Sequence, residues 1–280
     1  MSLGKPPIRR GGQWQGPATD VPLELLQHMK LRPLPITVGG TSNRTFTLNA
    51  STTHPAVIWN GDDFIYLKST VAYSFTTGTD SVLDSTGAET TQSAGTIGVY
   101  YMYLDATGEN ILPSTTGPDY VEYKYNTGAL GHPGTSRAQN WTYVGFVICD
   151  ATTPTFLSAV KTGFVYNIAP IGKTAISSFV AHSSWASAIP DLGKWGLTVS
   201  GDIAVTSTAT AVVNQVTISG NSTGSSFGAI RAMGVGGNSS ADITNYPYAG
   251  LTPADGGKIY SIASTTVNGT VYVSQITDVV

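Results

Sequence analysis

One pentapeptide in the chain has the spacing of a catalytic nucleophile. Gly220, Ser222 and Gly224 match the G-x-S-x-G pattern, in which a strained turn between a strand and a helix exposes a serine above an α/β sheet. The surrounding sequence, TISGNSTGSSFGAI, is instead rich in Ser and Gly turns within a region patterned as all-β, and it offers no partner for a triad. We therefore predict that Ser222 is not a nucleophile.

The carboxylates show no arrangement suited to acid-base catalysis. Glycoside hydrolysis needs two carboxyl groups that converge across a cleft, and Asp119 with Glu122, or Asp62 with Asp63, would converge only through the fold. Asp62 and Asp63 follow Asn-Gly and open a strand, which is the pattern of a hairpin turn. We expect a turn there rather than a catalytic pair.

Metal ligands are equally scattered. The four histidines form no H-x-H or H-E-x-x-H motif, and the segment DATGEN (105–110) lacks the spacing and length of an EF-hand loop, so a hairpin turn is the better prediction. Cys149 ends an alternating run (141–149) that is typical of a packed strand. We predict no metal, no cofactor and no catalytic residue, and only 11% of the residues are charged. These features favour a structural or binding protein over an enzyme.

Two further features carry binding chemistry. The segment 126–140 is too long for an ordinary hairpin and is a candidate surface loop or assembly arm, with Arg137 and His132 as its charged or titratable members. Tyrosines on two predicted strands could stack on sugars, but their alternation favours cross-strand packing. These tyrosines are Tyr100, Tyr101, Tyr103, Tyr123 and Tyr125.

From residue 36 onward, the sequence alternates Ser or Thr with Val, Ile, Tyr and Phe. This period of two, with turn-forming residues between short runs, predicts an all-β protein of antiparallel β-sandwich or jelly-roll-like domains. The clearest predicted strands cover residues 44–50, 56–60, 64–69, 71–77, 96–105, 121–126 and 141–149.

A change of pattern at residues 173–195 divides the chain. Ile176, Phe179, Val180 and Ile189 lie near helical spacing before Pro190, which predicts a short helical or irregular connector. Strand patterns with smaller side chains then return. The expected organisation is an anchoring arm with a short helix (1–35), a β domain (36–172), the connector (173–195) and a C-terminal β domain (196–280).

The N-terminal arm has no periodic core. Residues 1–19 are rich in Gly, Pro, Arg and Gln, with Trp14 as the one large apolar anchor. Asp20 is a suitable cap for a short helix, and Leu25, Leu26 and Met29 form its apolar stripe. A helix of about ten residues is marginal in water, so it must dock on its own domain or on another subunit. We predict that the arm binds a partner through Arg9, Arg10, Trp14, Leu25, Leu26 and Met29.

Charge is distributed unevenly along the chain. The first 44 residues hold six basic and two acidic residues, whereas the whole chain has a net charge of −3. The basic arm therefore suits an acidic protein surface, and the acidic remainder argues against nucleic-acid binding. The start of the sequence lacks the apolar run of a secretory signal, and no run approaches a membrane span. We expect synthesis in the cytoplasm and no membrane insertion.

Two segments resemble a known family. GVYYMYLDATGENILPS (98–114) and NWTYVGFVICDATTPTFLS (140–158), joined by a Gly- and Pro-rich excursion, are similar to strand cassettes of tail-fibre, head-fibre and related virion proteins of tailed bacteriophages. This resemblance covers about 60 residues and implies a non-enzymatic particle component, with the virion as its location and with capsid, portal or tail subunits as its partners.

The sequence therefore predicts a fibre or spike subunit of a tailed phage, anchored by its N-terminal arm. Alternatives are a capsid decoration protein that cements the shell, and a carbohydrate-binding or polysaccharide-cleaving module, with a host-surface glycan as partner. Many short strands with few charged residues leave sheet edges that oligomerisation would cover. We expect a homotrimer.

Overall fold

Every regular element that the structure describes is a β-strand, and every strand pair is antiparallel. The computed structural model describes residues 9–10, 13–14, 34–40, 44–60, 64–76, 78–93, 98–121, 129–134, 141–149, 156–175, 180–181, 198–207, 213–220, 230–235, 243–251, 260–263 and 267–278. Within them the all-β prediction is confirmed. The expected N-terminal helix lies outside the described residues.

The chain divides into two compact units. The first consists of Met1–Gly163 together with Val280, and the second of Phe164–Val279. The sequence placed the end of the first β domain at residue 172, which lies inside one continuous strand of the second unit, β16 (Val165–Ala175). Of the expected connector, residues 173–175 belong to β16 and Val180–Ala181 form β17. The rest of that connector lies outside the described residues.

The first unit contains a five-stranded sheet in the order β11-β10-β14-β13-β12. Its strands are β10 (Gly98–Leu104), β11 (Ile111–Ser114), β12 (Asp119–Val121), β13 (Ala129–Gly131) and β14 (Thr142–Cys149). A second group pairs in the order β15-β3-β4-β7. Its strands are β3 (Ile36–Gly39), β4 (Thr45–Leu48), β7 (Val71–Ser74) and β15 (Ala159–Thr162).

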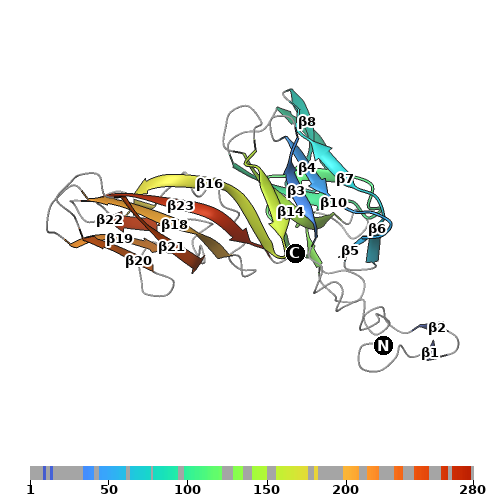
Figure 1. The fold of residues 1–280 in the computed structure, drawn as a ribbon. Coiled ribbons are helices and arrows are strands. Elements are labelled where there is room, and N and C mark those ends of the chain that lie inside the picture. The colour runs from blue at the N-terminus through green and yellow to red at the C-terminus, as the bar shows by residue number, and fades with distance from the viewer. Residues whose placement is uncertain are drawn as a thin grey trace. The chain divides into compact units, whose positions relative to one another are not determined.

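The first unit also contains two hairpins, of which Figure 1 labels β5, β6 and β8. They are β5 (Ala56–Trp59) with β6 (Phe64–Leu67), and β8 (Thr79–Leu83) with β9 (Glu89–Ser93). Strand β11 contacts β8 and β7, so residues from separate sheets meet around it. This contact positions the buried polar cluster described below.

The core of the first unit is rich in aromatic rings because β10 and β14 carry several Tyr and Phe residues, and Phe75 and Phe156 pack beside them. Phe75, Tyr100 and Phe156 form one cluster, with ring centroids 4.3 to 6.2 Å apart. Tyr143 joins Tyr101 and Tyr103 at 6.3 and 6.1 Å. Aromatic pairs of this kind add about 0.5–1.5 kcal/mol beyond their buried area. The large apolar side chains of β10 and β14 therefore stabilise the five-stranded sheet.

The second unit contains two groups of strands. One runs in the order β21-β18-β23-β16 and the other in the order β17-β22-β19-β20, and Figure 1 shows the long strands β16, β18 and β23 running alongside one another. Contacts of β18 with β19 and β20, and of β20 with β21, connect the two groups. The remaining bounds are β18 (Thr198–Ser207), β19 (Val213–Ser219), β20 (Ile230–Val235), β21 (Ile243–Leu251), β22 (Tyr260–Ala263) and β23 (Val267–Thr277).

The N-terminal arm contributes one small ladder. β1 (Arg9–Arg10) pairs with β2 (Gln13–Trp14), and the register sets Arg9 opposite Trp14. In the described part of the chain, these two strands of the first unit pair with each other and with no other strand.

Candidate functional site

A buried serine and a buried histidine form the one described cluster that resembles catalytic machinery. Ser114 lies at the end of β11 and His132 follows β13, so non-local strand pairing brings them together. Ser114 Oγ and His132 Nε2 are 3.1 Å apart. The exposed fraction is 1% for Ser114 and 0% for His132. The sequence singled out His132 only as a loop residue and did not single out Ser114.

The hydrogen bonds assign the proton positions in this pair. The backbone N–H of Gly134 donates to His132 Nδ1 at 3.2 Å. Because a backbone N–H can only donate, Nδ1 is an acceptor and the neutral ring carries its proton on Nε2. Nε2 therefore donates to Ser114 Oγ. The serine hydroxyl in turn donates to the carbonyl of Leu83 at 2.9 Å.

This geometry is the reverse of a catalytic dyad. A nucleophilic serine gives its proton to an unprotonated Nε2, while Nδ1–H donates to an orienting group. Here Ser114 Oγ accepts hydrogen bonds from Nε2–H and from the backbone N–H of Thr116, the latter at 3.1 Å. The pair is thus arranged to connect the ends of β8, β11 and β13, and it is not arranged to activate Ser114.

The surroundings of His132 keep the ring neutral. Burial lowers the pKa of His132, and the nearby charge of Asp84 opposes this effect only in part. The ring of Tyr103 lies edge-on to the imidazole, with centroids 5.0 Å apart, and its hydroxyl donates to the carbonyl of Thr116 at 2.7 Å. An apolar wall and a closed hydrogen-bond set both favour the uncharged imidazole.

A second candidate site is a surface on the β5–β6 hairpin. The strand register pairs Trp59 with Phe64 and Val57 with Tyr66. These four residues share the outward side of the hairpin, because the alternate residues Ala56, Ile58, Ile65 and Leu67 are buried. We call Val57, Trp59, Phe64 and Tyr66 the aromatic face.

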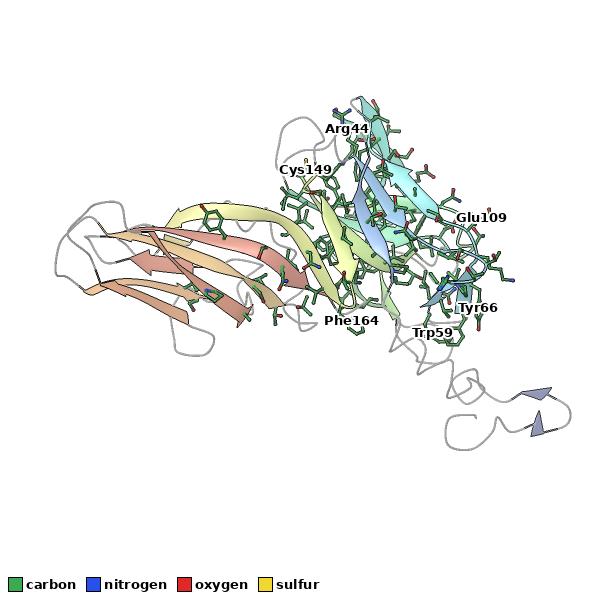
Figure 2. All side chains as sticks on the ribbon, viewed as in Figure 1. Arg44, Trp59, Tyr66, Glu109, Cys149 and Phe164 are labelled. Atoms are coloured by element: carbon green, nitrogen blue, oxygen red, sulfur yellow. The ribbon has the colours of Figure 1, made fainter. Side chains whose placement is uncertain are left out.

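The aromatic face combines large rings with solvent exposure. Tyr66 is 50% exposed, and Trp59 and Phe64 are partly exposed. The rings of Trp59 and Phe64 are 4.8 Å apart and tilted by 51°, and those of Phe64 and Tyr66 are 6.5 Å apart and tilted by 58°. Figure 2 shows Trp59 and Tyr66 on this hairpin. Such a surface has the chemistry of a binding site, since Trp and Tyr carry much of the energy in protein interfaces.

The sequence contained a signal for this surface. Both strands were predicted, and Asn60-Gly61 marked the turn between them. A hairpin closed at Trp59 and Phe64 places these two rings opposite each other and puts Tyr66, two residues on, on the same side. The burial of the alternate residues was the missing information, because it decides which side faces outward.

Other predicted residues have clear positions. Tyr100, Tyr101 and Tyr103 are buried, which confirms cross-strand packing for these three, and Cys149 is a buried thiol at the end of β14. Asp105–Asn110 connects the antiparallel strands β10 and β11, which confirms the hairpin turn. The described part of the chain contains no group of three or more His, Cys, Asp or Glu residues that could hold a metal ion.

Several predicted residues are not described. Arg9, Arg10 and Trp14 lie in the β1–β2 ladder, whereas Leu25, Leu26 and Met29 lie outside the described residues. So do Ser222, Glu122, Asp62, Asp63, Tyr123 and Tyr125. The strand that precedes Ser222, β19, pairs antiparallel with β20 and β22, unlike the parallel sheet beneath a nucleophile elbow.

Comparisons with known proteins give no family. No protein-family model matches the chain, and no curated protein matches it. One solved structure found by comparison is titled "Structure of infectious bursal disease virus Gx strain"; it is 11% identical, the match covers 88% of this chain and 71% of that one, and the TM-score is 0.17. That score is too low to support an argument about fold or function. In the described residues, no helix has the length and apolar character needed to cross a membrane.

Proposed function

We propose that this chain is a non-enzymatic structural subunit of a tailed-phage particle, a fibre or spike protein attached by its N-terminal arm. The observation that carries the proposal is the pairing within the arm: its described strands, β1 and β2, form a ladder only with each other. A basic arm whose described strands form no ladder with the other described strands is suited to binding another protein.

The chemistry of the β units agrees with a structural role. The Ser114–His132 pair is held in hydrogen bonds that connect strands, and the aromatic face offers binding rather than reactive groups. We further propose that the units are β-sandwich or jelly-roll-like, because strands of separate sheets contact each other within each unit. We also propose a homotrimer as the assembled form, because many short strands with few charged residues would leave sheet edges that oligomerisation covers.

Particle composition tests this proposal directly. Mass spectrometry of particles purified from the source of the sequence should detect the chain, and trypsin should cut the free protein at Arg9 or Arg10 but leave these sites intact on particles. A variant that lacks residues 1–35 should fail to incorporate. Purified particles without the chain, or normal incorporation of the truncated variant, would contradict the proposal.

Two alternatives make different predictions. A decoration protein would use the same arm to cement capsid subunits, and it would be present in hundreds of copies across the shell rather than in a few copies at a tail or vertex. A carbohydrate-binding module is favoured by the exposed rings of Trp59, Phe64 and Tyr66, because such rings stack on sugars. Copy number in a particle reconstruction distinguishes a decoration protein from a fibre or spike subunit. Oligosaccharide binding by the purified chain distinguishes a carbohydrate-binding module from both.

A further inference from the structure

We propose that His132 and Gly134 form a proton-operated latch: when His132 binds a proton at Nδ1, Gly134 detaches from the turn between β8 and β9 while the first unit stays folded. The latch consists of the bond that the Gly134 N–H donates to His132 Nδ1 and of the contact between Gly134 and that turn. It uses residues of the first unit alone, so it goes beyond the proposed function and would operate whether or not the chain belongs to a particle.

Few backbone bonds hold the segment that carries Gly134. Strand β13 pairs with β14 through Gly131 and Thr142, and the N–H of His132 then donates to the carbonyl of Trp141 at 2.9 Å. Pro133 follows and has no N–H to add to this ladder. Within the described residues, Gly134 thus lies beyond the last backbone bond of β13, and its N–H is held by the ring of His132 at 3.2 Å.

The turn on the other side of this contact keeps its shape by itself. Gly134 lies against the backbone of Ser85 and Thr86 so closely that an added Cβ would overlap both. The turn is closed by the bond from the Gly87 N–H to the carbonyl of Asp84 at 3.0 Å, and the carboxylate of Asp84 accepts further bonds from within the turn. None of these bonds involves Gly134, so Gly134 can leave without unfolding the turn.

Protonation breaks one hydrogen bond of the histidine and leaves the other in place. In the neutral ring, Nε2 carries the proton that bonds to Ser114 Oγ at 3.1 Å, so an added proton can bind only at Nδ1. Both ring nitrogens of an imidazolium are donors. Nδ1–H and the Gly134 N–H would then face each other as two donors, which cannot bond. Gly134 must move away for water to solvate Nδ1–H, whereas the bond to Ser114 persists.

The titratable neighbours of the ring stay in one charge state over the pH range of the latch. Among the described residues, burial raises the pKa of Tyr103, so its hydroxyl stays neutral. Hydrogen bonding, chiefly from the Thr86 hydroxyl, lowers the pKa of Asp84, so its carboxylate stays charged above about pH 4. Titration of His132 is therefore the change to which the latch responds.

The proton favours the open form of the latch. Burial lowers the pKa of His132 in the closed form, and the charge of Asp84 opposes this effect only in part. A ring that Gly134 has left is solvated at Nδ1, so its pKa moves back toward about 6.5. Above about pH 6.5 neither form binds the proton and the latch stays closed. Below that pH the open form binds the proton first, so the equilibrium constant for opening rises, by at most about tenfold per pH unit.

Amide hydrogen exchange of the full-length protein, measured by NMR at single amides, tests the latch. Protection factors remove the intrinsic pH dependence of exchange, so they report opening alone. The protection factor of Gly134 should fall by up to about tenfold per pH unit below about pH 6.5. Those of Thr116, which donates to Ser114 Oγ, of Phe146 in β14 and of Gly108 in the second turn should stay constant, because no proton faces their bonds.

Two histidine variants assign the pH response to one ring. His132→Asn removes the titratable group and keeps a side-chain oxygen that can accept from the Gly134 N–H, so the protection factor of Gly134 should no longer depend on pH. His54→Asn is the matched control, because His54 is an exposed histidine in the turn that ends the 51–54 segment. That variant should keep the full pH response of Gly134.

Several results would overturn the latch. One is a Gly134 protection factor that stays constant from about pH 7 to about pH 5, and another is a pH response that persists in His132→Asn. Equal losses of protection at Gly134 and at Thr116 or Phe146 would show that the cluster or the whole unit opens, and not Gly134 alone. The ring nitrogen shifts of His132 in the unmodified protein need no variant: a neutral ring with its proton on Nδ1 would contradict the proposal directly.

Discussion

Two turns in the first unit have nearly the same sequence, yet they support different parts of the molecule. Asp84-Ser-Thr-Gly87 connects β8 to β9, and Asp105-Ala-Thr-Gly108 connects β10 to β11. In both, the glycine N–H donates to the carbonyl of the aspartate, at 3.0 and 3.1 Å, and the glycine has φ near +76° or +77°. The shared pattern therefore determines a shared local structure, because short-range hydrogen bonds and a left-handed glycine suffice to form it.

The two turns differ in what covers them. Gly134 packs so closely on the first turn that an added Cβ would overlap the backbone of Ser85 and Thr86, and the same segment delivers His132 to Ser114. The second turn packs against Ile65 and Leu67 of the hairpin that bears the aromatic face. One turn thus supports a buried polar cluster and the other supports the exposed aromatic face. The comparison shows that tertiary contacts, and not the turn sequence, decide which role each turn has.

Loss of His132 should produce the largest effect. His132→Ala removes a fully buried ring, leaves a cavity beside Tyr103, and deprives the Gly134 N–H of its acceptor. Together these effects should destabilise the protein by about 3–4 kcal/mol. Ser114→Ala removes only one hydroxyl and should have a smaller effect of about 1–2 kcal/mol. Urea unfolding of both variants measures the difference, and equal effects would contradict the central role assigned to the histidine.

Adding one methyl group at each turn contact should separate backbone packing from side-chain packing. Gly134→Ala pushes a Cβ into the main chain of the first turn, which cannot move aside locally, so we expect a loss of about 2–3 kcal/mol. Gly108→Ala meets side-chain methyl groups and also requires a non-glycine residue at positive φ, which costs about 1–2 kcal/mol. The Gly108 variant should in addition disturb the aromatic face, and tryptophan fluorescence is the readout for that change. A fluorescence change in the Gly134 variant alone would reverse the assignment of the two turns.

As the pH falls, the contact between the His132 segment and the first turn (84–87) should weaken before the contact between the second turn (105–108) and the β5–β6 hairpin. The pKa of His132 is lowered in the folded protein, so below about pH 6.5 the unfolded chain binds a proton that the folded chain does not, and stability falls as the pH decreases. The slope for one proton cannot exceed about 1.4 kcal/mol per pH unit. A proton on Nδ1 would also face the Gly134 N–H. His132→Asn should flatten the fall in urea midpoint between about pH 7 and pH 5; an unchanged pH dependence would show that another group is responsible.

The sequence predicted the strands of the first unit best where apolar and polar residues alternate. The predicted segments 56–60 and 64–69 correspond to β5 and β6, and 141–149 corresponds to β14. Strands β8 and β9 were missed, because TDSVL and ETTQS are mostly polar and are held by pairing with each other. The DATGEN turn was predicted because its hydrogen bonds are local. The Ser114–His132 pair was not, because strand order brings together residues that no local pattern connects.

Aspartate-to-asparagine substitutions should give the smallest and most discriminating difference between the turns. Asp84 accepts its bonds from Thr86 and Ala88 through Oδ1 alone, and hydrogen bonding by Thr86 is the main reason that the pKa of Asp84 is lowered.

Asp105 uses both oxygens. Oδ1 accepts from Thr107 and Glu109, and Oδ2 accepts from the side-chain amide of Asn110 at 2.7 Å. An asparagine has one oxygen acceptor, so it can replace Asp84 but must place an NH₂ group against a donor at position 105.

We therefore expect Asp105→Asn to destabilise the protein by about 0.5–1 kcal/mol, because the site is partly exposed and solvent compensates part of the loss. Asp84→Asn should leave the urea midpoint at neutral pH close to that of the unmodified chain. Removing the Asp84 charge should also lower the pKa of His132 further, because the attraction that opposes the effect of burial is lost. Asp84→Asn should thus extend to lower pH the fall in stability that His132 causes, whereas Asp105→Asn should leave that part of the fall unchanged. Because the pKa values of Asp84 and Asp105 are both lowered in the folded protein, each substitution should also remove that carboxyl group's own loss of stability below about pH 4. If Asp84→Asn is the more destabilising variant at neutral pH, its second oxygen has a role that the hydrogen bonds of the turn do not show.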